Sequence, residues 1–314
     1  MSHPPMFRAA WLPVVLCLAA CGGSPEPPPS EPAAPVADPA QALEALLLAD
    51  RTFAAVSADV DVVSGLSAMF DDTVIMAVPG QPFAIGKAAA RAALEANPAN
   101  LDSRASWTPV RAGLSADGLH GFTFGYMTVT RSDETVTPAK YLAYWVKGSG
   151  GWRVAVYRRG PRPEGDVPPE MMPPALPPQM VAPTTDDAAL AALRAELEAA
   201  ERAFSDEAQV IGLGPAFAKH GSADAVNMGG PGDATFVVGA DAIGRSVSAG
   251  QPASGGSTLS WAPEQSLVAS SGDLGVTIGR IVTNPVPGQE ERVFPFFTIW
   301  RRAAPGEPWR YVAE

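Results

Sequence analysis

The chain repeats itself, and this repeat limits the fold more than any other feature of the sequence. Two stretches, Tyr141–Tyr157 (YLAYWVKGSGGWRVAVY) and Phe297–Ala313 (FTIWRRAAPGEPWRYVA), have the same order of parts. Each has an aromatic strand that ends in Trp and a nearby basic residue, then a Gly-containing turn, then Trp-Arg and a second apolar strand. In a chain of 314 residues, this predicts two similar domains of ordinary size.

The match extends upstream of these hairpins. ADRTF at 49–53 corresponds to AERAF at 200–204, and one offset of 154 positions relates Trp107 to Trp261 and Gly125 to Gly279. Further upstream we align Asp72–Met76 with Asp224–Met228, as well as Phe70 with Phe217. That alignment leaves 218–223 as an insertion in the second repeat, opposite the single residue 71.

Each repeat reads as helices followed by strands. Apolar residues recur at helical spacing at the start of each repeat, as in Leu43, Leu46 and Leu47. The later segments alternate apolar and polar residues, as strands with one buried face do. We therefore predict an α+β fold with two units, each with helices packed in a curved antiparallel sheet, over 40–160 and 187–314.

One proline-rich stretch precedes the first unit, and another lies between the two units. Residues 24–39 and 160–186 hold 16 of the 33 prolines, a composition that favours extended polyproline II spacers. We predict a tether over 21–39 and a linker over 161–186.

The N-terminus has the composition of a targeting segment. An apolar run follows Arg8 and ends in Leu-Ala-Ala-Cys at 18–21, which resembles the bacterial lipobox. The resemblance implies a signal peptide over 1–20, cleavage before Cys21 and lipid attachment to its thiol. Gly22 after the cysteine implies sorting to the outer membrane. We therefore expect a lipid-anchored protein of the bacterial cell envelope that faces the periplasm.

Composition excludes several kinds of site. Cys17 would be removed with the signal peptide and Cys21 would carry lipid, so the mature chain would have no free thiol. Only His120 and His220 would remain, and we expect both in surface loops. We therefore expect no metal and no cofactor. The net charge of −11 argues against nucleic acid as a partner, because phosphate binding needs a basic face.

The repeated motifs resemble a known superfamily. The helix motif A-[DE]-R-x-F together with the closing hairpin W-x-[KR]…W-R resembles the SnoaL-like superfamily, and within it the group called domain of unknown function 4440. The resemblance covers about 42–158 and 187–314. It implies two cone-shaped nuclear transport factor 2-like barrels, each with an apolar cavity. Members of that superfamily include isomerases, dehydratases, hydrolases and non-enzymatic binding modules, so the resemblance selects no function.

Asp72 and Asp224 are the candidate catalytic residues. In enzymatic relatives a carboxylate near this strand can act as a general base, and an apolar pocket would raise its pKa. The alternative is that each Asp satisfies turn donors and faces water. Aromatic and methionine side chains are candidates to line a ligand pocket, with core packing as the alternative: Met76, Trp107, Tyr126, Tyr141, Trp145, Met228, Trp261 and Trp300.

Three functions remain open from the sequence. The first is a binding module for a small apolar molecule or a protein partner. The second is an isomerase, dehydratase or hydrolase that uses a pocket Asp. The third is a structural module in which the two domains pair within the chain. The hydroxyls and histidines do not recur between the repeats, which favours binding over catalysis.

Overall fold

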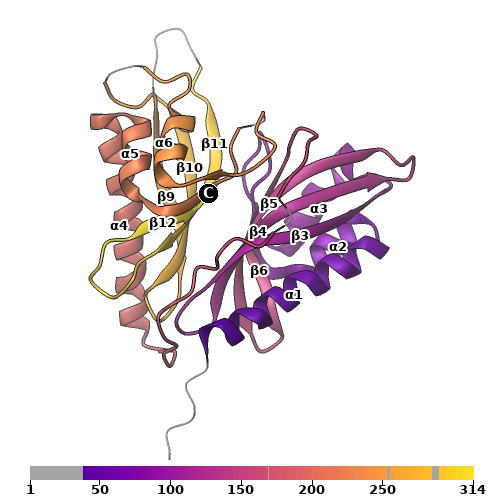
Figure 1. Cartoon of the computed structure of the whole chain (residues 1–314), viewed down its shortest axis with the longest axis horizontal. Coiled ribbons are helices and arrows are strands. Elements are labelled where there is room, and N and C mark those ends of the chain that lie inside the picture. Colours follow the sequence, from indigo (N-terminus) through magenta and orange to yellow (C-terminus); the bar gives the residue numbers. More distant parts are fainter. Residues whose placement is uncertain (1–37, 169, 231, 253–254, 285–289) are drawn as a thin grey trace, which may run out of the picture. The chain divides into compact units, whose positions relative to one another are not determined.

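The computed structural model describes residues 38–168, 170–230, 232–252, 255–284 and 290–314. Within these residues the chain forms two halves that have the same order of elements (Figure 1). The signal peptide, Cys21 and most of the predicted tether lie outside the described residues. In the part of the chain that the structure describes, no helix is long and apolar enough to span a membrane.

Each half begins with two helices, continues with two short strands and then a third helix, and ends with four strands. In the first half these are α1 (Pro39–Asp59), α2 (Val62–Met69), β1 (Phe70–Met76), β2 (Ala84–Ile85), α3 (Lys87–Glu95), η1 (Pro98–Asn100), β3 (Ser103–Leu114), β4 (His120–Arg131), β5 (Val136–Gly148) and β6 (Gly151–Pro161). In the second half they are α4 (Asp187–Ile211), α5 (Leu213–His220), β7 (Gly221–Asn227), β8 (Val237–Val238), α6 (Ala240–Val247), β9 (Leu259–Val268), β10 (Leu274–Thr283), β11 (Val293–Arg301) and β12 (Arg310–Ala313).

The long helices start at side-chain caps. The Asp38 carboxylate accepts from the backbone N–H of Ala40 at 2.9 Å, and Pro39 occupies the first turn of α1. Asp186 caps α4 in the same way, accepting from two backbone N–H groups. These caps set where each half's helical segment begins.

The two sheets have the same strand order. They run β2-β1-β6-β5-β4-β3 and β8-β7-β12-β11-β10-β9. The predicted α+β fold class is confirmed. We predicted antiparallel sheets, and this part of the prediction is wrong. Both sheets are mixed, because β1 lies parallel to β6 and β7 parallel to β12. Parallel partners need a long connection, and here the rest of each half provides it.

A bulge bends each sheet at the same place. The register of β3 with β4 shifts between Pro109 and Arg111, and that of β9 with β10 shifts where Gly279 pairs. A Cβ on Gly125 would lie 2.0 Å from the carbonyl oxygen of Thr108, and the matching position in the second half is equally tight. The recurring glycines therefore permit the close strand contact that curves each sheet around its helices.

The strand register corrects our alignment of the repeats. The N–H of Gly86 donates to the carbonyl of Val74 at 2.7 Å, and the N–H of Gly239 donates to the carbonyl of Ala225 at 2.7 Å. These are equivalent bonds, because each follows the short hairpin of β1 with β2 or of β7 with β8. Val74 therefore corresponds to Ala225, which is an offset of 151 positions.

The same offset applies from the first helix to the end of β1, so the predicted insertion at 218–223 is wrong. Those residues complete α5 and begin β7, which match α2 and β1 in length. The counterpart of Asp224 is then Thr73, and that of Asp72 is Ala223. Since neighbouring strand residues face opposite sides of a sheet, the one-residue error had paired side chains that point in opposite directions.

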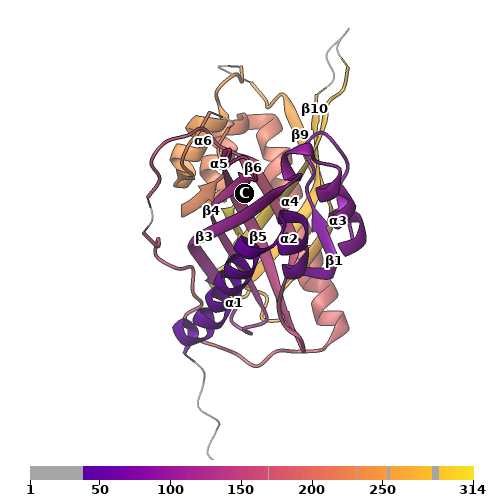
Figure 2. The same ribbon diagram turned by 90° about the vertical axis from the view of Figure 1, so that its right-hand side faces the viewer.

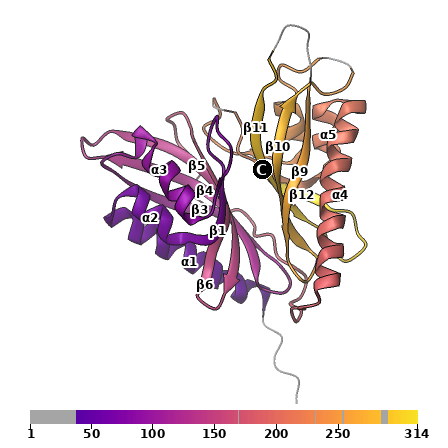
Figure 3. The ribbon, with the colours of Figure 1, turned by 180° about the vertical axis from the view of Figure 1, so that it is seen from behind.

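Helices cover one face of each sheet. Figure 1 shows α4, α5 and α6 along β9–β12, Figure 3 shows α4 and α5 there from behind, and Figure 2 shows α1, α2 and α3 in front of the first sheet. Between the helices and the concave face of each sheet lies an apolar core, which includes Leu46 and Trp145 in the first half and Leu197 and Trp300 in the second.

A third apolar cluster joins the other faces of the two sheets. It includes Phe124 and Leu142 of the first half and Ile278 and Phe297 of the second. The ring of Phe236, which precedes β8, packs 4.8 Å from that of Phe124. Contacts of this kind remove apolar sheet surface from water.

Charged side chains cross between the halves around this cluster. The Arg111 guanidinium donates to the backbone carbonyl and the carboxylate of Asp224. The Lys140 ammonium donates to the carbonyl oxygens of Met228, Asp233 and Thr235, the last two at 2.6 and 3.1 Å. These bonds satisfy cations that the packing has taken out of water.

The proline-rich linker runs along the edge of the first sheet. The N–H groups of Met172 and Ala175 donate to β3 carbonyls at 2.7 and 3.0 Å. Ala175 also forms a parallel bridge with Gly113, and Met180 packs on the first core. The linker thus covers an otherwise open edge strand instead of serving only as a spacer.

Candidate functional site

A buried carboxylate sits in the first helix of each half, and sequence reasoning missed both. Asp50 of α1 and Glu201 of α4 are fully buried. The Asp50 carboxylate accepts from the indole N–H of Trp107 at 2.7 Å and from the hydroxyl of Tyr141 at 3.0 Å. The helix thereby holds the strands of its own sheet through hydrogen bonds as well as apolar contact.

Glu201 makes the equivalent bonds with a longer side chain. It accepts from the indole N–H groups of Trp261 at 2.6 Å and Trp300 at 2.9 Å, and from the hydroxyl of Thr277. In the first half the shorter Asp50 does not reach the Trp145 indole, which donates to a threonine instead. We call these two arrangements the carboxylate clamps.

Burial is the main cause of the pKa shift at both clamps. It raises the pKa of Asp50 and of Glu201, while the donated hydrogen bonds act in the opposite direction. Every carboxylate oxygen of the clamps already has a donor, and neither residue lines a cavity described below. The clamps are therefore structural. The signal was present in the sequence as the acid of A-[DE]-R-x-F, which recurs off the leucine stripe.

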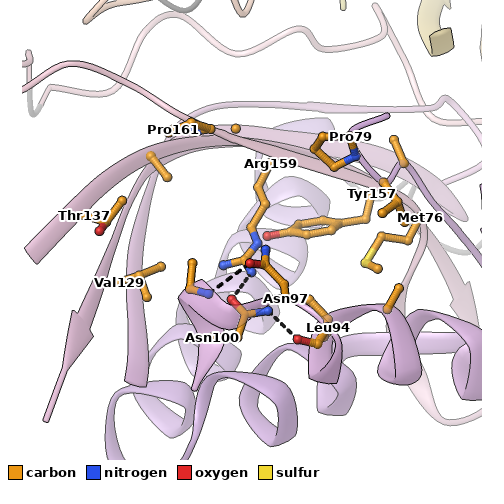
Figure 4. Close-up of a pocket in the computed structure, with 16 residues that line it drawn as sticks. Met76, Pro79, Leu94, Asn97, Asn100, Val129, Thr137, Tyr157, Arg159 and Pro161 are labelled. Atoms are coloured by element: carbon orange, nitrogen blue, oxygen red, sulfur yellow. Dashed lines mark hydrogen bonds between the residues drawn. The ribbon is translucent and has the colours of Figure 1, made fainter. Parts of the chain in front are cut away.

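The first half contains a cavity of about 230 Å³ between its sheet and α3 (Figure 4). Its wall is mainly apolar and includes Met76, Leu94 and Val129. Two polar side chains enter it from β6, Tyr157 and Arg159, which share one face of the strand because they are two positions apart.

The polar groups of this cavity are only partly satisfied. One Arg159 nitrogen donates to the side-chain oxygen of Asn100, whose amide nitrogen donates to the Leu94 carbonyl at 2.7 Å. The Tyr157 hydroxyl is fully buried and has no hydrogen-bond partner among the described residues. Burial raises the pKa of Tyr157 far above its usual range, so the hydroxyl is a neutral donor.

The second half has its own cavity of about 380 Å³, with a different polar group. Glu314 lines it, and its carboxylate accepts from the Asn227 amide at 3.2 Å and from the Thr298 hydroxyl at 3.4 Å. Burial, followed by the charge of Glu201, raises the pKa of Glu314 to about 8. Arg158 of the first half also lines this cavity.

Glu314 and Tyr157 occupy equivalent positions. The N–H of Ala77 donates to the Tyr157 carbonyl at 2.9 Å, and the N–H of Met228 donates to the Glu314 carbonyl at 2.9 Å. Under the 151-position offset, Ala77 corresponds to Met228. The two halves therefore direct different chemistry from one position, a hydroxyl in the first cavity and a carboxyl in the second.

Neither aspartate that we predicted as catalytic lies in these cavities. Asp72 is exposed on β1. Asp224 is exposed for 64% of its side chain, and it pairs with Arg111. Hydrogen bonds from Ser222 and the charge of Arg111 hold its pKa below the usual value despite partial burial. Both lack the apolar enclosure that would make either one a general base near neutral pH.

The pocket candidates divide by sheet face. Met76 lines the first cavity and Trp261 the second. Four others are buried in the concave cores, where they donate hydrogen bonds: Trp107, Tyr141, Trp145 and Trp300. Tyr126 and Met228 lie on the opposite faces, in the cluster between the halves. For these six, the alternative of packing describes the structure better.

We expected both histidines in surface loops, but the structure places them elsewhere. His120 begins β4, and its Nδ1 lies 2.9 Å from the Tyr144 hydroxyl, while His220 ends α5 with its Nε2 2.7 Å from Glu207. Burial lowers the pKa of both rings. Across the described ranges, no group of three or more potential metal ligands gathers.

Several solved structures are similar to this chain. An NTF2-like protein with a cystatin-like fold from Novosphingobium aromaticivorans is 16% identical with a TM-score of 0.32, covering 38% of this chain and 81% of its own. A putative scytalone dehydratase from the same organism is 12% identical with a TM-score of 0.32, covering 41% and 91%. A ketosteroid isomerase-like protein from Erwinia carotovora is 22% identical with a TM-score of 0.26, covering 40% and 95%. No family model and no curated protein matches the sequence.

Proposed function

We propose that this protein binds a small, largely apolar molecule in the cavity of its first half. The observation that carries the proposal is an apolar cavity of about 230 Å³ that contains an unpartnered, fully buried hydroxyl. A cavity of about 150 Å³ is enough to hold benzene, so a molecule of one ring with a polar substituent fits this one. Few polar groups on an apolar wall are typical of small-molecule sites.

Filling the cavity tests the proposal. Ala139 lines it, and the second half has Phe294 at the matching place, since Ala139 pairs with Met127 as Phe294 pairs with Ile281. Native mass spectrometry of the Ala139→Phe protein should show loss of the small molecule that copurifies with, or is added to, the unmodified protein. Val136→Phe, on the exposed part of the same strand, is the matched control. Equal binding to both variants would refute the site.

We further propose that the protein acts at the bacterial envelope, held by lipid on Cys21 and sorted to the outer membrane with its body in the periplasm. The support is the sequence Leu-Ala-Ala-Cys-Gly at 18–22 behind an apolar run. Metabolic labelling with a fatty acid should mark the protein, and Cys21→Ser should remove both the label and its sedimentation with membranes. Labelling that survives the substitution would contradict the assignment.

A second candidate function, acid–base chemistry, is favoured by Glu314 in the cavity of the second half. A carboxyl with a pKa of about 8 is mostly protonated at neutral pH, yet can give up its proton to a bound molecule. The acid of an isomerase, dehydratase or hydrolase would then be Glu314, not Asp72 or Asp224. Deuterium exchange at the α-carbon of small ketones, followed by NMR, should rise around pH 8 in the unmodified protein and not in Glu314→Gln. Equal rates in both proteins would exclude this role.

We also infer that the two halves act as an internal pair, which could by itself serve a purely structural role. The apolar cluster between the sheets supports pairing, as do the bonds of Arg111 and Lys140. Pairing and ligand binding are compatible, because the cavity of the first half lies on the helix side of its sheet. A purely structural role would leave both cavities without an occupant under all conditions.

A further inference from the structure

The cavity of the first half holds a positive charge with no anion from the described residues beside it. The Arg159 guanidinium lines the cavity and bonds to the neutral side chain of Asn100. Among the described residues, no carboxylate forms an ion pair with it. Burial lowers the pKa of Arg159, but a guanidinium keeps its proton in proteins. A partly buried charge of this kind is compensated only when an anion reaches it.

Tyr157 adds a second donor directed at the same space. Its hydroxyl is fully buried without a partner, although buried polar groups nearly always have one. Figure 4 shows the Tyr157 hydroxyl near the end of the Arg159 side chain, within the apolar wall. Arg159 and Tyr157 therefore direct two donors at one space, and no anion of the described residues accepts from them. A ligand would supply the missing acceptor.

We propose that the ligand of this cavity is a small carboxylate with an apolar body, such as an aryl or short aliphatic monocarboxylate. Its two oxygens would accept from Arg159 and Tyr157, because the planar guanidinium fork matches a carboxylate. Its body would lie against Met76, Leu94 and Val129. This inference rests on the proposed binding function and specifies the chemical class of the ligand.

A monocarboxylate suits the cavity better than a phosphate ester. One arginine supplies one positive charge, and the remaining described polar neighbours, among them Asn97 and Asn100, are neutral. A doubly charged group would leave one negative charge uncompensated against an apolar wall. The second cavity differs in this respect, because Glu314 takes the place of Tyr157 there and would repel an anion when ionised.

Three ligands of one shape test the charge requirement on the full chain. Isothermal titration with benzoate, benzamide and benzylamine compares charges of −1, 0 and +1 on the same ring. We expect benzoate to bind at least about tenfold more tightly than benzamide, since hydrogen bonds to charged groups are the stronger ones. Benzylamine should not bind in this cavity. Ala139→Phe should abolish the benzoate signal and so locate it.

Single variants separate the two donors. Arg159→Met keeps the apolar stem and should reduce the affinity for benzoate to that for benzamide. Tyr157→Phe should weaken benzoate by about fivefold to tenfold. Arg104→Gln removes the same charge from an exposed position of β3 and should change nothing. Thermal unfolding checks that each variant is folded. If Arg159→Met is not folded, Arg159→Lys replaces it, because lysine retains the charge but lacks the planar fork.

The outcomes distinguish the inference from the function on which it rests. Binding of benzoate and benzamide with equal affinity, both lost in Ala139→Phe, would overturn the carboxylate inference and leave the cavity as a binding site. An equal effect of Arg104→Gln and Arg159→Met would also overturn it, because net charge alone would then be responsible. No binding of any of the three ligands would contradict both the inference and the proposed binding function.

Discussion

Replacing Glu314 by Gln should make folding stability less dependent on pH. The carboxyl lines the cavity of the second half, where burial and the charge of Glu201 disfavour its ionised form. Its pKa is 4.5 in the unfolded chain and about 8 in the folded protein. Between these two values the folded state binds one more proton than the unfolded state. Stability therefore falls as pH rises from about 4.5 to 8.

The size of the effect follows from the shift. At about 1.36 kcal/mol per pKa unit, a rise from 4.5 to about 8 corresponds to an upper limit of about 5 kcal/mol at high pH. Between pH 5 and pH 8 the free energies of unfolding of Glu314→Gln and the unmodified protein should diverge by about 3 kcal/mol. Burial also raises the pKa of Asp50 and Glu201, but both proteins contain these groups, so their contribution cancels in the difference.

Urea unfolding followed by tryptophan fluorescence, in steps of pH from 5 to 9, measures this divergence. Trp261 lines the same cavity and reports on it directly. Glu307→Gln, at an exposed position of the second half, is the matched control and should follow the unmodified protein at every pH. Parallel stability curves for the unmodified protein and Glu314→Gln would show that Glu314 is ionised and solvated, and would refute both the burial argument and the acid–base candidate.

Three further predictions concern the frame of each half. Glu201→Leu leaves the buried indole N–H of Trp261 without its acceptor and takes one of two acceptors from the Trp300 indole, so it should lower the free energy of unfolding by about 1 to 3 kcal/mol, with a smaller loss contradicting the clamp. Gly279→Ala places a Cβ 2.0 Å from the Ala262 carbonyl oxygen and should lower the melting temperature by several degrees, whereas Gly148→Ala, with open space around it, should not. Lys140→Met removes the donors to three carbonyls near β8 and should speed amide exchange there; unchanged exchange would argue against tight pairing of the halves.

The repeat was readable because its most distinctive residues are large or conformationally special. Tryptophans that fill a concave sheet and glycines at a bulge leave few substitutes, so Trp107 aligns with Trp261 and Gly125 with Gly279. The cap at Asp186 also has a local signal, since this aspartate directly precedes an apolar stripe. Local patterns of this kind carry fold class and element order.

Register was not readable, because it depends on hydrogen bonds between strands. Aligning Asp72 with Asp224 matched residue type and ignored the strand hydrogen bonds that make Val74 the counterpart of Ala225. A strand alternates faces at each residue, so an error of one position moved a surface aspartate onto the wrong counterpart. The resulting catalytic candidates are exposed side chains that lie outside the cavity of the first half and the cavity that Glu314 lines.

The cavity residues could be predicted only in part. Met76 and Trp261 line the cavities, but Arg159 and Glu314 lie beyond the motif that carries the resemblance, and each is identified only by the space it enters. The clamp acids Asp50 and Glu201 were visible as a recurring type. Their burial was not, because a charged residue on a helix is usually solvated.

The two halves preserve the residues that hold the fold and differ where the cavity is lined. In each clamp a carboxylate of the first helix accepts hydrogen bonds from the strands. Asp50 accepts from Trp107 and Tyr141, whereas the longer Glu201 accepts from Trp261 and Trp300. At the equivalent cavity position the first half has Tyr157 and the second has Glu314, and no such matching occurs. Stability does not require this difference, and Glu314 reduces stability at neutral pH, so we attribute the difference to the proposed ligand binding. The two cavities should therefore accept different classes of molecule, with the anion in the first half.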